Sequence, residues 1–237
     1  MPDPRWEALA DILINHSVRP ETGETLLIEC FDLPDSTLPR LLVRKAAERG
    51  AIPLVETRDN RIVRELVARG SAETIRKWAE VDRHRMEQVQ AYLGLRGAWN
   101  ISEMSDVPAD KLDLYNTLYQ KPVHFEQRVP KTKWCVLRLP SPSMAQQAGV
   151  GTEAFEDFYF DVCTLDYAKM SRALEPLVAR MEKAREVRIT GPGTELSFSI
   201  AGIPVVPCAG RMNIPDGEVF TAPVRDSIEG RIHFNTP

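Results

Sequence analysis

The sequence predicts an α/β fold: a parallel-sheet N-terminal domain with flanking helices, followed by the first strands of a β-rich catalytic domain. Two observations carry this prediction. Helical and strand patterns alternate from Trp6 to about Lys183, and from Glu186 onward short apolar segments are separated by Gly and Pro. We therefore place a boundary at 184/185, which divides the chain into residues 1–184 and an incomplete second domain at 185–237.

The chain opens with an amphipathic helix, because apolar residues recur at helical spacing from Trp6 to Leu13. Apolar runs at 25–30 and 52–56 predict buried strands. Between them, residues 38–49 have the period of a helix and are followed by Gly50, a usual residue just beyond a helix end. Strand–helix–strand order of this kind favours parallel strands with a right-handed crossover.

The rest of the first domain continues the alternation. A helix ends at Gly70, and Ser71 can cap a long helix that runs to about Leu93, with Glu73 favourably placed in its first turn. The other elements expected in this domain are a helix at 62–69, a third strand at 97–101, one helix near 109–119, a fourth strand at 134–139, a loop at 140–143, and helices at 153–165 and 167–183.

The pattern changes after residue 185. Residues 186–190, 195–200 and 203–206 predict short strands, and Ala201-Gly202 suits a hairpin between the last two. A last strand at 230–235 leads to Thr236-Pro237. So few strands need support from the first domain, another chain or further sequence.

Composition excludes several classes of function. The chain has 237 residues, with 30 Lys and Arg against 34 Asp and Glu, so its net charge of −4 does not favour nucleic acid as a partner. It carries no phosphate-loop, serine-hydrolase elbow, HExxH or CxxC motif. No signal peptide and no run long enough to span a bilayer is present, so we expect a cytoplasmic protein without a membrane partner.

The four cysteines, Cys30, Cys135, Cys163 and Cys208, lie far apart in the sequence. Cys30 and Cys135 occur in apolar runs that read as buried strands, where a free cysteine behaves as a small hydrophobic residue. We expect reduced structural thiols rather than disulfides or metal ligands.

Two histidines were weighed as functional residues. Glu80, His84 and Glu87 lie on one face of the predicted long helix and have the spacing of a metal-binding face, but a solvated face with Glu–Lys and Glu–Arg pairs explains them better. His233 alternates with Ile232 and Phe234, which indicates the polar face of a strand.

The most informative carboxylate is Glu218. Pro215 presets φ for a turn and Gly217 tolerates a positive φ, so Glu218 is held at the start of the strand that includes Val219. Taken alone it reads as an exposed strand-start residue. The acids Asp216, Asp226 and Glu229 crowd the same short stretch, which could make an oxygen-rich pocket suited to a divalent cation. A hydrolytic metal centre still needs at least about three protein ligands.

One run carries a family resemblance: Asn213-Ile-Pro-Asp-Gly-Glu-Val-Phe-Thr-Ala-Pro-Val-Arg-Asp-Ser-Ile-Glu-Gly230. At these residues the chain resembles the metal-dependent aminopeptidases of the aminopeptidase T/aminopeptidase S (thermophilic aminopeptidase) type. Supporting matches lie in the opening helix from Trp6, at Glu153–Phe158 and at Glu186–Phe198. The similarity spans nearly the whole chain.

The resemblance implies a homodimeric peptidase with two divalent ions, Zn, Co or Mn, in its catalytic domain. It implies that Glu218 is a metal ligand, and that the metals activate a water molecule that releases the N-terminal residue of a peptide substrate. The family's remaining ligands, a second Glu, two His and an Asp, lie downstream of this motif. We therefore expect them beyond Pro237, and we expect residues 1–237 to be a C-terminally truncated member that is inactive alone.

Two alternatives remain open. An Fe(II)-dependent ring-cleaving dioxygenase has a similar fold, but uses one iron held by two His and a carboxylate, and the intact Glu218 motif speaks against it. The other alternative is a non-catalytic dimerisation or binding module.

Overall fold

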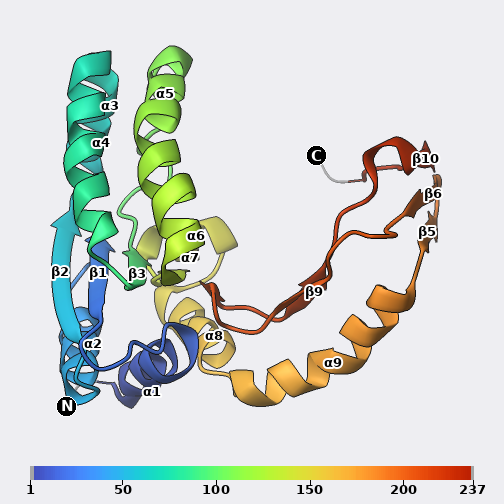
Figure 1. Ribbon diagram of the computed structural model, residues 1–237, viewed down its shortest axis with the longest axis horizontal. Helices are drawn as coiled ribbons and strands as arrows, with labels where there is room; N and C mark the ends of the chain where they lie inside the picture. The colour runs from blue at the N-terminus through green and yellow to red at the C-terminus, as the bar shows by residue number, and fades with distance from the viewer. Residues whose placement is uncertain (1–2, 236–237) are drawn as a thin grey trace. The chain divides into compact units, whose positions relative to one another are not determined.

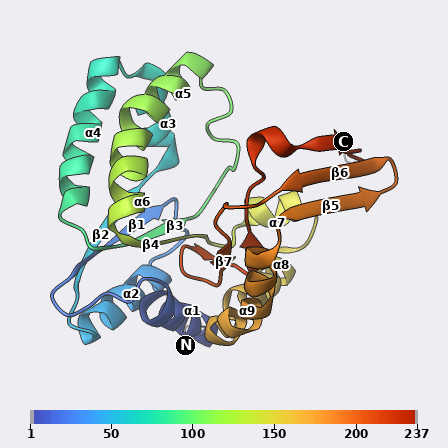
Figure 2. The ribbon, with the colours of Figure 1, turned by 45° about the vertical axis from the view of Figure 1, so that its right-hand side comes forward.

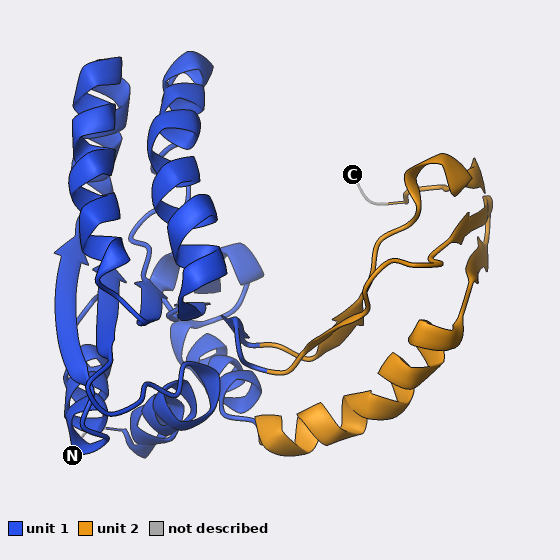
Figure 3. Ribbon diagram, in the orientation of Figure 1, with its two compact units in different colours: residues 1–165, 210–215 blue, residues 166–209, 216–237 orange. Residues whose placement is uncertain are grey.

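The computed structural model describes residues 3–235 and divides into two compact units (Figure 3). The first unit comprises residues 1–165 and 210–215, and the second comprises 166–209 and 216–237. The chain thus leaves the first unit, returns to it for a short segment and leaves again. Thr236 and Pro237, which follow the strand predicted at 230–235, lie outside the described residues.

The first unit is an α/β unit with a central parallel sheet, as predicted. Its elements in chain order are α1 (Pro4–Ile12), the π-helical turn η1 (Leu13–Ser17), β1 (Thr25–Phe31), α2 (Thr37–Glu48), β2 (Ile52–Arg58), α3 (Asn60–Arg69), α4 (Ala72–Glu87), β3 (Ala91–Arg96), α5 (Ala109–Tyr115), the π-helix η2 (Asn116–Arg128), α6 (Val129–Lys131), β4 (Lys133–Arg138), α7 (Pro142–Ala148), α8 (Thr152–Cys163) and β8 (Asn213–Ile214).

The strands are ordered β2-β1-β3-β4-β8, and every neighbouring pair is parallel. In Figure 1 the arrows of β1 and β2 point towards the side from which α3, α4 and α5 extend. On one face of the sheet, Leu27 and Tyr92 pack against Met86 of α4. On the other face α2 contacts β1 and β2 and is in turn covered by α1. The central strands are buried on both faces, which is usual for parallel sheets.

The third strand is not where the sequence analysis placed it. The helix capped by Ser71 ends at Glu87, not near Leu93, and the strand is Ala91–Arg96, whereas 97–101 is irregular or turn. Residues 91–95 are all buried. A short apolar run buried on both faces has no period of two, so periodicity does not distinguish it from the end of a helix.

Two further predictions were wrong in the same unit. The helix expected near 109–119 continues without interruption through η2 and α6 to Lys131, because π-type hydrogen bonding carries the helix past Pro122. Of the expected loop at 140–143, only residues 140–141 lie outside a helix. The helix α7 begins at Pro142, and the Ser141 hydroxyl caps it by accepting a hydrogen bond from the Met144 N–H.

The second unit contains one α-helix, α9, and two small antiparallel sheets among its described residues. Its elements are α9 (Tyr167–Lys183), β5 (Glu186–Gly191), β6 (Thr194–Ser199), β7 (Val206–Cys208), β9 (Glu218–Phe220), the 3-10 turn η3 (Arg225–Ser227) and β10 (Glu229–Arg231). One sheet has the order β10-β6-β5, and β7 pairs with β9 in the other. Figure 2 shows β5 and β6 side by side as a hairpin.

The predicted hairpin at Ala201-Gly202 was wrong. The hairpin forms at Pro192-Gly193 between β5 and β6, where Gly193 has a φ of +69°. The segment at 203–206 contributes only Val206 to a strand, and that strand pairs with β9 rather than with β6. The last strand is also shorter than expected, ending at Arg231. Pairing between strands that are separated in the sequence depends on tertiary contacts, which the residues of a local turn do not predict.

The predicted fold class is confirmed in both units. The compact units are defined by contacts within the chain, and they assign α9 to the second unit. They do not test the domain boundary predicted at 184/185, which stays a prediction. Among the described residues no helix is long and apolar enough to cross a bilayer. Cys30 and Cys135 are buried, as expected, and Cys163 is buried as well.

Candidate functional site

Glu218 is the first residue of β9 and is exposed. Gly217 has the expected positive φ, +146°, and the Ile214–Pro215 peptide bond is cis, a feature that was not predicted. Backbone pairing places Glu218 directly opposite Cys208 of β7. The carboxylate therefore stands on a defined position of a two-stranded ribbon, as the Pro-Asp-Gly turn indicated.

The local environment of Glu218 is acidic. Burial, and after it the carboxylates of Asp216 and Glu218, raise the pKa of the Cys208 thiol above its ordinary value. The acidic surroundings of Cys208 thus favour its thiol over its thiolate.

The other acids of the motif do not complete a metal site. Asp226 lies in η3 and Glu229 begins β10, which pairs with β6 rather than with the ribbon that carries Glu218. Within residues 3–235, no group of three or more His, Cys, Asp or Glu side chains is arranged to hold a metal ion. The expectation of an oxygen-rich pocket formed by these acids was therefore wrong. His233 is exposed and lies beyond the end of β10.

Glu80, His84 and Glu87 lie on a solvated helical face, as predicted in preference to a metal-binding face. Lys77 pairs with Glu80 at 2.9 Å and Arg83 pairs with Glu87 at 3.1 Å. His84 is 80% exposed at its side chain. Neighbouring cations satisfy these carboxylates.

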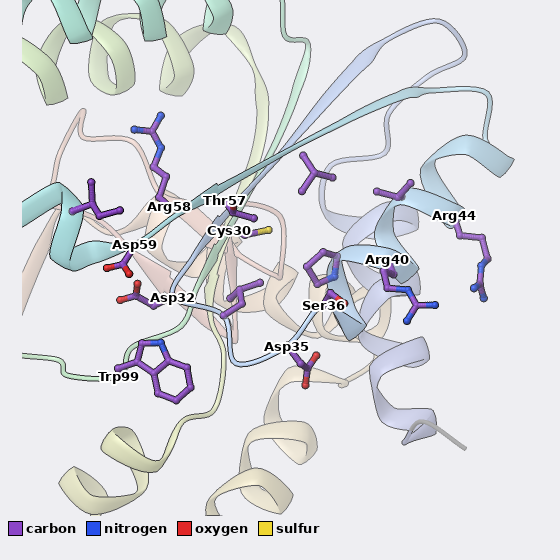
Figure 4. A pocket seen from close by; sticks show the side chains of 15 residues that line it. Cys30, Asp32, Asp35, Ser36, Arg40, Arg44, Thr57, Arg58, Asp59 and Trp99 are labelled. Carbon is purple, nitrogen blue, oxygen red and sulfur yellow. The ribbon is translucent and has the colours of Figure 1, made fainter.

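A cavity of about 860 Å³ in the first unit lies between α2, the strands β1 and β2, and Trp99 (Figure 4). Figure 4 shows Asp32 and Asp59 close together near Trp99, while Arg40 and Arg44 project from α2. A pair of acids in a cavity is a candidate for proton transfer or metal binding.

The hydrogen bonds of these two acids give them a structural role instead. Asp32 accepts from the backbone N–H of Asn60 at 2.8 Å and from its side-chain amide at 2.7 Å, while Asp59 caps α3 by accepting from the Arg61 N–H. The Arg61 side chain also bonds to Asp59, and these bonds hold the pKa of that carboxyl below its ordinary value. Both acids therefore organise the start of α3.

Three arginines that were not predicted as site residues lie at one edge of the sheet: Arg58, Arg96 and Arg138. Each is the last residue of its strand, in β2, β3 and β4 respectively. The available signal was a basic residue closing each apolar run, but the relation among the three depends on strand register.

The fold and the Glu218 turn define a protein with a doubly wound α/β unit and a β-rich extension that presents a carboxylate at a strand start. The chain belongs to the thermophilic metalloprotease (M29) family, whose sequence model matches residues 3–237. The family membership predicted from the sequence is therefore confirmed.

Solved structures agree with the fold. Wild-type AmpT from Thermus thermophilus superimposes with a TM-score of 0.76 at 22% sequence identity, over 95% of this chain and 63% of AmpT. The chain thus spans less than two thirds of the length of AmpT. The 2,5-dihydroxypyridine dioxygenase from Pseudomonas putida KT2440 gives a TM-score of 0.49 at 13% identity, over 95% of this chain and 57% of the dioxygenase. This second likeness is too weak to support the dioxygenase alternative. No curated protein matches the sequence.

Membership of a metalloprotease family implies divalent metal ions. The described residues do not form such a centre by themselves, because Glu218 stands without two further ligands beside it. A metal ion in this region would need ligands in addition to those of residues 3–235.

Proposed function

We propose that the protein is a metal-dependent aminopeptidase in which Glu218 is a ligand of one of two divalent metal ions, Zn, Co or Mn. The observation that supports this assignment is the placement of Glu218: exposed, opposite Cys208 in a paired ribbon, directly after Gly217 in its positive-φ turn. A side chain held in this way is positioned before any metal arrives, which lowers the entropic cost of ligation.

The further parts of the proposal follow the family. The substrate is a peptide with a free N-terminus, the active form is a homodimer, and the protein acts in the cytoplasm. The remaining metal ligands are a second Glu, two His and an Asp, which we expect outside the described residues.

The test compares two chains, residues 1–237 and a longer reading frame that includes downstream His, Asp and Glu residues. We expect the longer chain, loaded with Zn²⁺, Co²⁺ or Mn²⁺, to cleave aminoacyl-p-nitroanilides, and residues 1–237 to show negligible activity. Glu218→Ala in the longer chain should reduce kcat/KM by at least about 100-fold, because loss even of a residue that only supports a metal ligand costs about 10–100-fold.

Glu229→Ala is the matched control, since Glu229 belongs to the same motif but begins a strand in the other sheet. It should retain most of the activity. A metal-loaded longer chain that cleaves no aminoacyl-p-nitroanilide would contradict the proposal. Fe²⁺-dependent oxygen consumption with a dihydroxypyridine would support the dioxygenase instead. Tight stoichiometric binding of Zn²⁺ by residues 1–237, lost in Glu218→Ala, would contradict the need for additional ligands.

A further inference from the structure

A second cavity of about 320 Å³ lies in the first unit at the carboxyl ends of the parallel strands. Its lining includes Phe31 at the end of β1, Arg96 at the end of β3 and Gly97 just beyond it. The strand order β2-β1-β3-β4 reverses direction between β1 and β3. Ligands of open α/β sheets bind outside the carboxyl ends of the strands at this reversal, and the volume is in the range of small-molecule sites.

Three arginines form a row across this edge of the sheet. The register pairs Phe31 with Arg58 on one side and with Arg96 on the other, and it pairs Arg96 with Arg138. Residues in register on adjacent strands point to the same face, so the three guanidinium groups share one face and line one cavity. Glu103 is the one carboxylate among the residues that line it.

The charges of the three arginines are not equally compensated. Arg58 forms ion pairs with Glu29 at 2.6 Å and with Asp82 at 2.7 Å, and its side chain is only 9% exposed. Arg96 and Arg138 are exposed, and among residues 3–235 neither has a carboxylate at ion-pairing distance. Two neighbouring, uncompensated guanidinium groups repel each other and are stabilised by an anion placed between them.

The other wall of the cavity is aromatic and well ordered by its contacts. Trp78 and Tyr119 have ring centroids 4.1 Å apart, and Tyr115 stacks on Tyr119 at 5.1 Å. The Tyr119 hydroxyl donates a short hydrogen bond to Asp82, and Tyr119 is 2% exposed. Tyr119 therefore supports the wall from behind, and the half-buried rings of Trp78 and Tyr115 present flat apolar surface to the cavity.

His124 also lines the cavity and is neutral. Burial, followed by the charges of Arg128, Arg58 and Arg96, lowers the pKa of His124 to about 3. Its Nδ1 accepts a hydrogen bond from Nε of Arg128 at 3.1 Å, so the neutral ring carries its proton on Nε2. The cavity therefore offers donors, and its local potential is positive.

We propose that this cavity binds a small organic anion, with its phosphate or carboxylate group held by Arg96 and Arg138 and a planar ring against the Trp78–Tyr115–Tyr119 wall. Arg96 and Arg138 also line a cavity of about 380 Å³ beside Phe155 and Phe158, so their guanidinium groups are reachable from a second opening. The site lies wholly in the first unit and uses no residue of the Glu218 motif.

The test is isothermal titration of residues 1–237 at low ionic strength with inorganic phosphate, phenyl phosphate and benzoate. We expect one site per chain, with phenyl phosphate bound about tenfold more tightly than inorganic phosphate because of the aromatic wall. Benzoate distinguishes a carboxylate ligand from a phosphate ligand. Arg96→Gln and Arg138→Gln should each weaken binding by about tenfold, and the double variant should abolish it.

Arg40→Gln is the matched control, because Arg40 is an exposed arginine that lines the other cavity. It should bind the probes like the parent chain. The Arg96 and Arg138 variants should keep the parent's melting temperature without ligand, since both side chains are exposed. The absence of binding to all three probes would overturn the proposal, and so would affinities that Arg96→Gln and Arg138→Gln leave unchanged.

Equal weakening by Arg40→Gln would likewise overturn it, because that result means non-specific attraction of anions. Glu218→Ala and treatment with EDTA should not alter the affinity. This readout therefore separates the fate of the anion site from that of the aminopeptidase proposal.

Discussion

At the scale of single residues, the first unit is organised around buried charges that compensate one another. Glu29 is 1% exposed, and it accepts a hydrogen bond from the Tyr92 hydroxyl at 2.6 Å besides pairing with Arg58. Asp82 joins Arg58 and Arg85. Removal of one member of such a network leaves a buried charge without its partner and is strongly destabilising. The network therefore fixes Arg58 in the wall of the anion cavity and compensates its charge, so that Arg96 and Arg138 are left to bind a ligand.

His124 makes the stability of the first unit depend on pH. Its pKa is lowered from 6.5 to about 3 in the folded chain. The unfolded chain therefore binds a proton between these values that the folded chain does not bind. The free energy of unfolding should fall as pH decreases from about 6.5 towards 3, by no more than about 1.4 kcal/mol per pH unit from this one group.

Urea unfolding at pH 7.0 and 4.5 measures this dependence, and His124→Asn should lose less stability over the interval than the parent chain. Asn keeps an acceptor for Arg128 without a group that titrates. His84→Asn is the control, since His84 is 80% exposed and should leave the pH dependence unchanged. An unchanged dependence in His124→Asn would contradict the assignment of this acid sensitivity to His124.

At the scale of elements, Gly97 sets how closely the chain that leaves β3 approaches the chain that leaves β1. Its N–H donates to the Phe31 carbonyl at 2.7 Å, and a Cβ at this position would lie 2.2 Å from the carbonyl oxygen of Asp32. Gly97→Ala should lower the free energy of unfolding by about 1–3 kcal/mol, because one backbone segment must move. Urea denaturation is the measurement.

Gly151→Ala is the matched control for this substitution. Gly151 has a φ of −68°, and nothing lies within 4 Å of the position of its Cβ. The free energy of unfolding of Gly151→Ala should differ from that of the parent chain by less than about 0.5 kcal/mol. Equal effects of the two substitutions would mean that the approach of Gly97 to Asp32 is not a constraint on the fold.

Several elements followed from the sequence because local chemistry specifies them. Ser71 caps α4 by accepting from the Thr74 N–H at 3.1 Å, and the apolar run of β1 is a buried strand, both as expected. The β3 segment was misread because its burial on both faces removes the alternation that marks a strand. The helix expected near 109–119 extends further than predicted, because π-type bonding accommodates Pro122 inside it.

The two candidate sites, the Glu218 position and the arginine row, differ in whether local sequence specifies them. The position of Glu218 at a strand start follows from three adjacent residues, Pro215, Asp216 and Gly217, and could be predicted. The row of Arg58, Arg96 and Arg138 depends on the register of four strands that are distant in the sequence. No local pattern reports that register, so this site became visible only in the folded chain.

At the scale of the whole molecule, the two units differ in how much they bury. Among the described residues of the second unit, the buried hydrophobic ones are Tyr167, Ile200 and Ala209, whereas β1, β3 and their neighbours supply an extended core to the first unit. Local stability follows buried apolar contacts. We expect hydrogen–deuterium exchange at the amides of β1 and β3 to be at least about 100-fold slower than at those of β5 and β6.

Exchange in the longer reading frame is the informative comparison. Exposed side chains of the second unit, such as Ile189, Phe220 and Phe234, should become protected there if further sequence or a partner subunit covers them. Equal protection of β1 and β5 in residues 1–237 would contradict the expected difference between the units.

The return of the chain to the first sheet has a consequence for biosynthesis. Strands β2, β1, β3 and β4 have all left the ribosome once Arg138 has emerged, but β8 follows only after α9 and β5–β7 have been translated. Since domains fold from the N-terminus during synthesis, the nascent sheet exposes the open edge of β4 throughout that interval. A pause in translation between Leu165 and Asn213 would prolong that exposure, and the edge at Val136 and Leu137 is where a nascent-chain chaperone would be needed most.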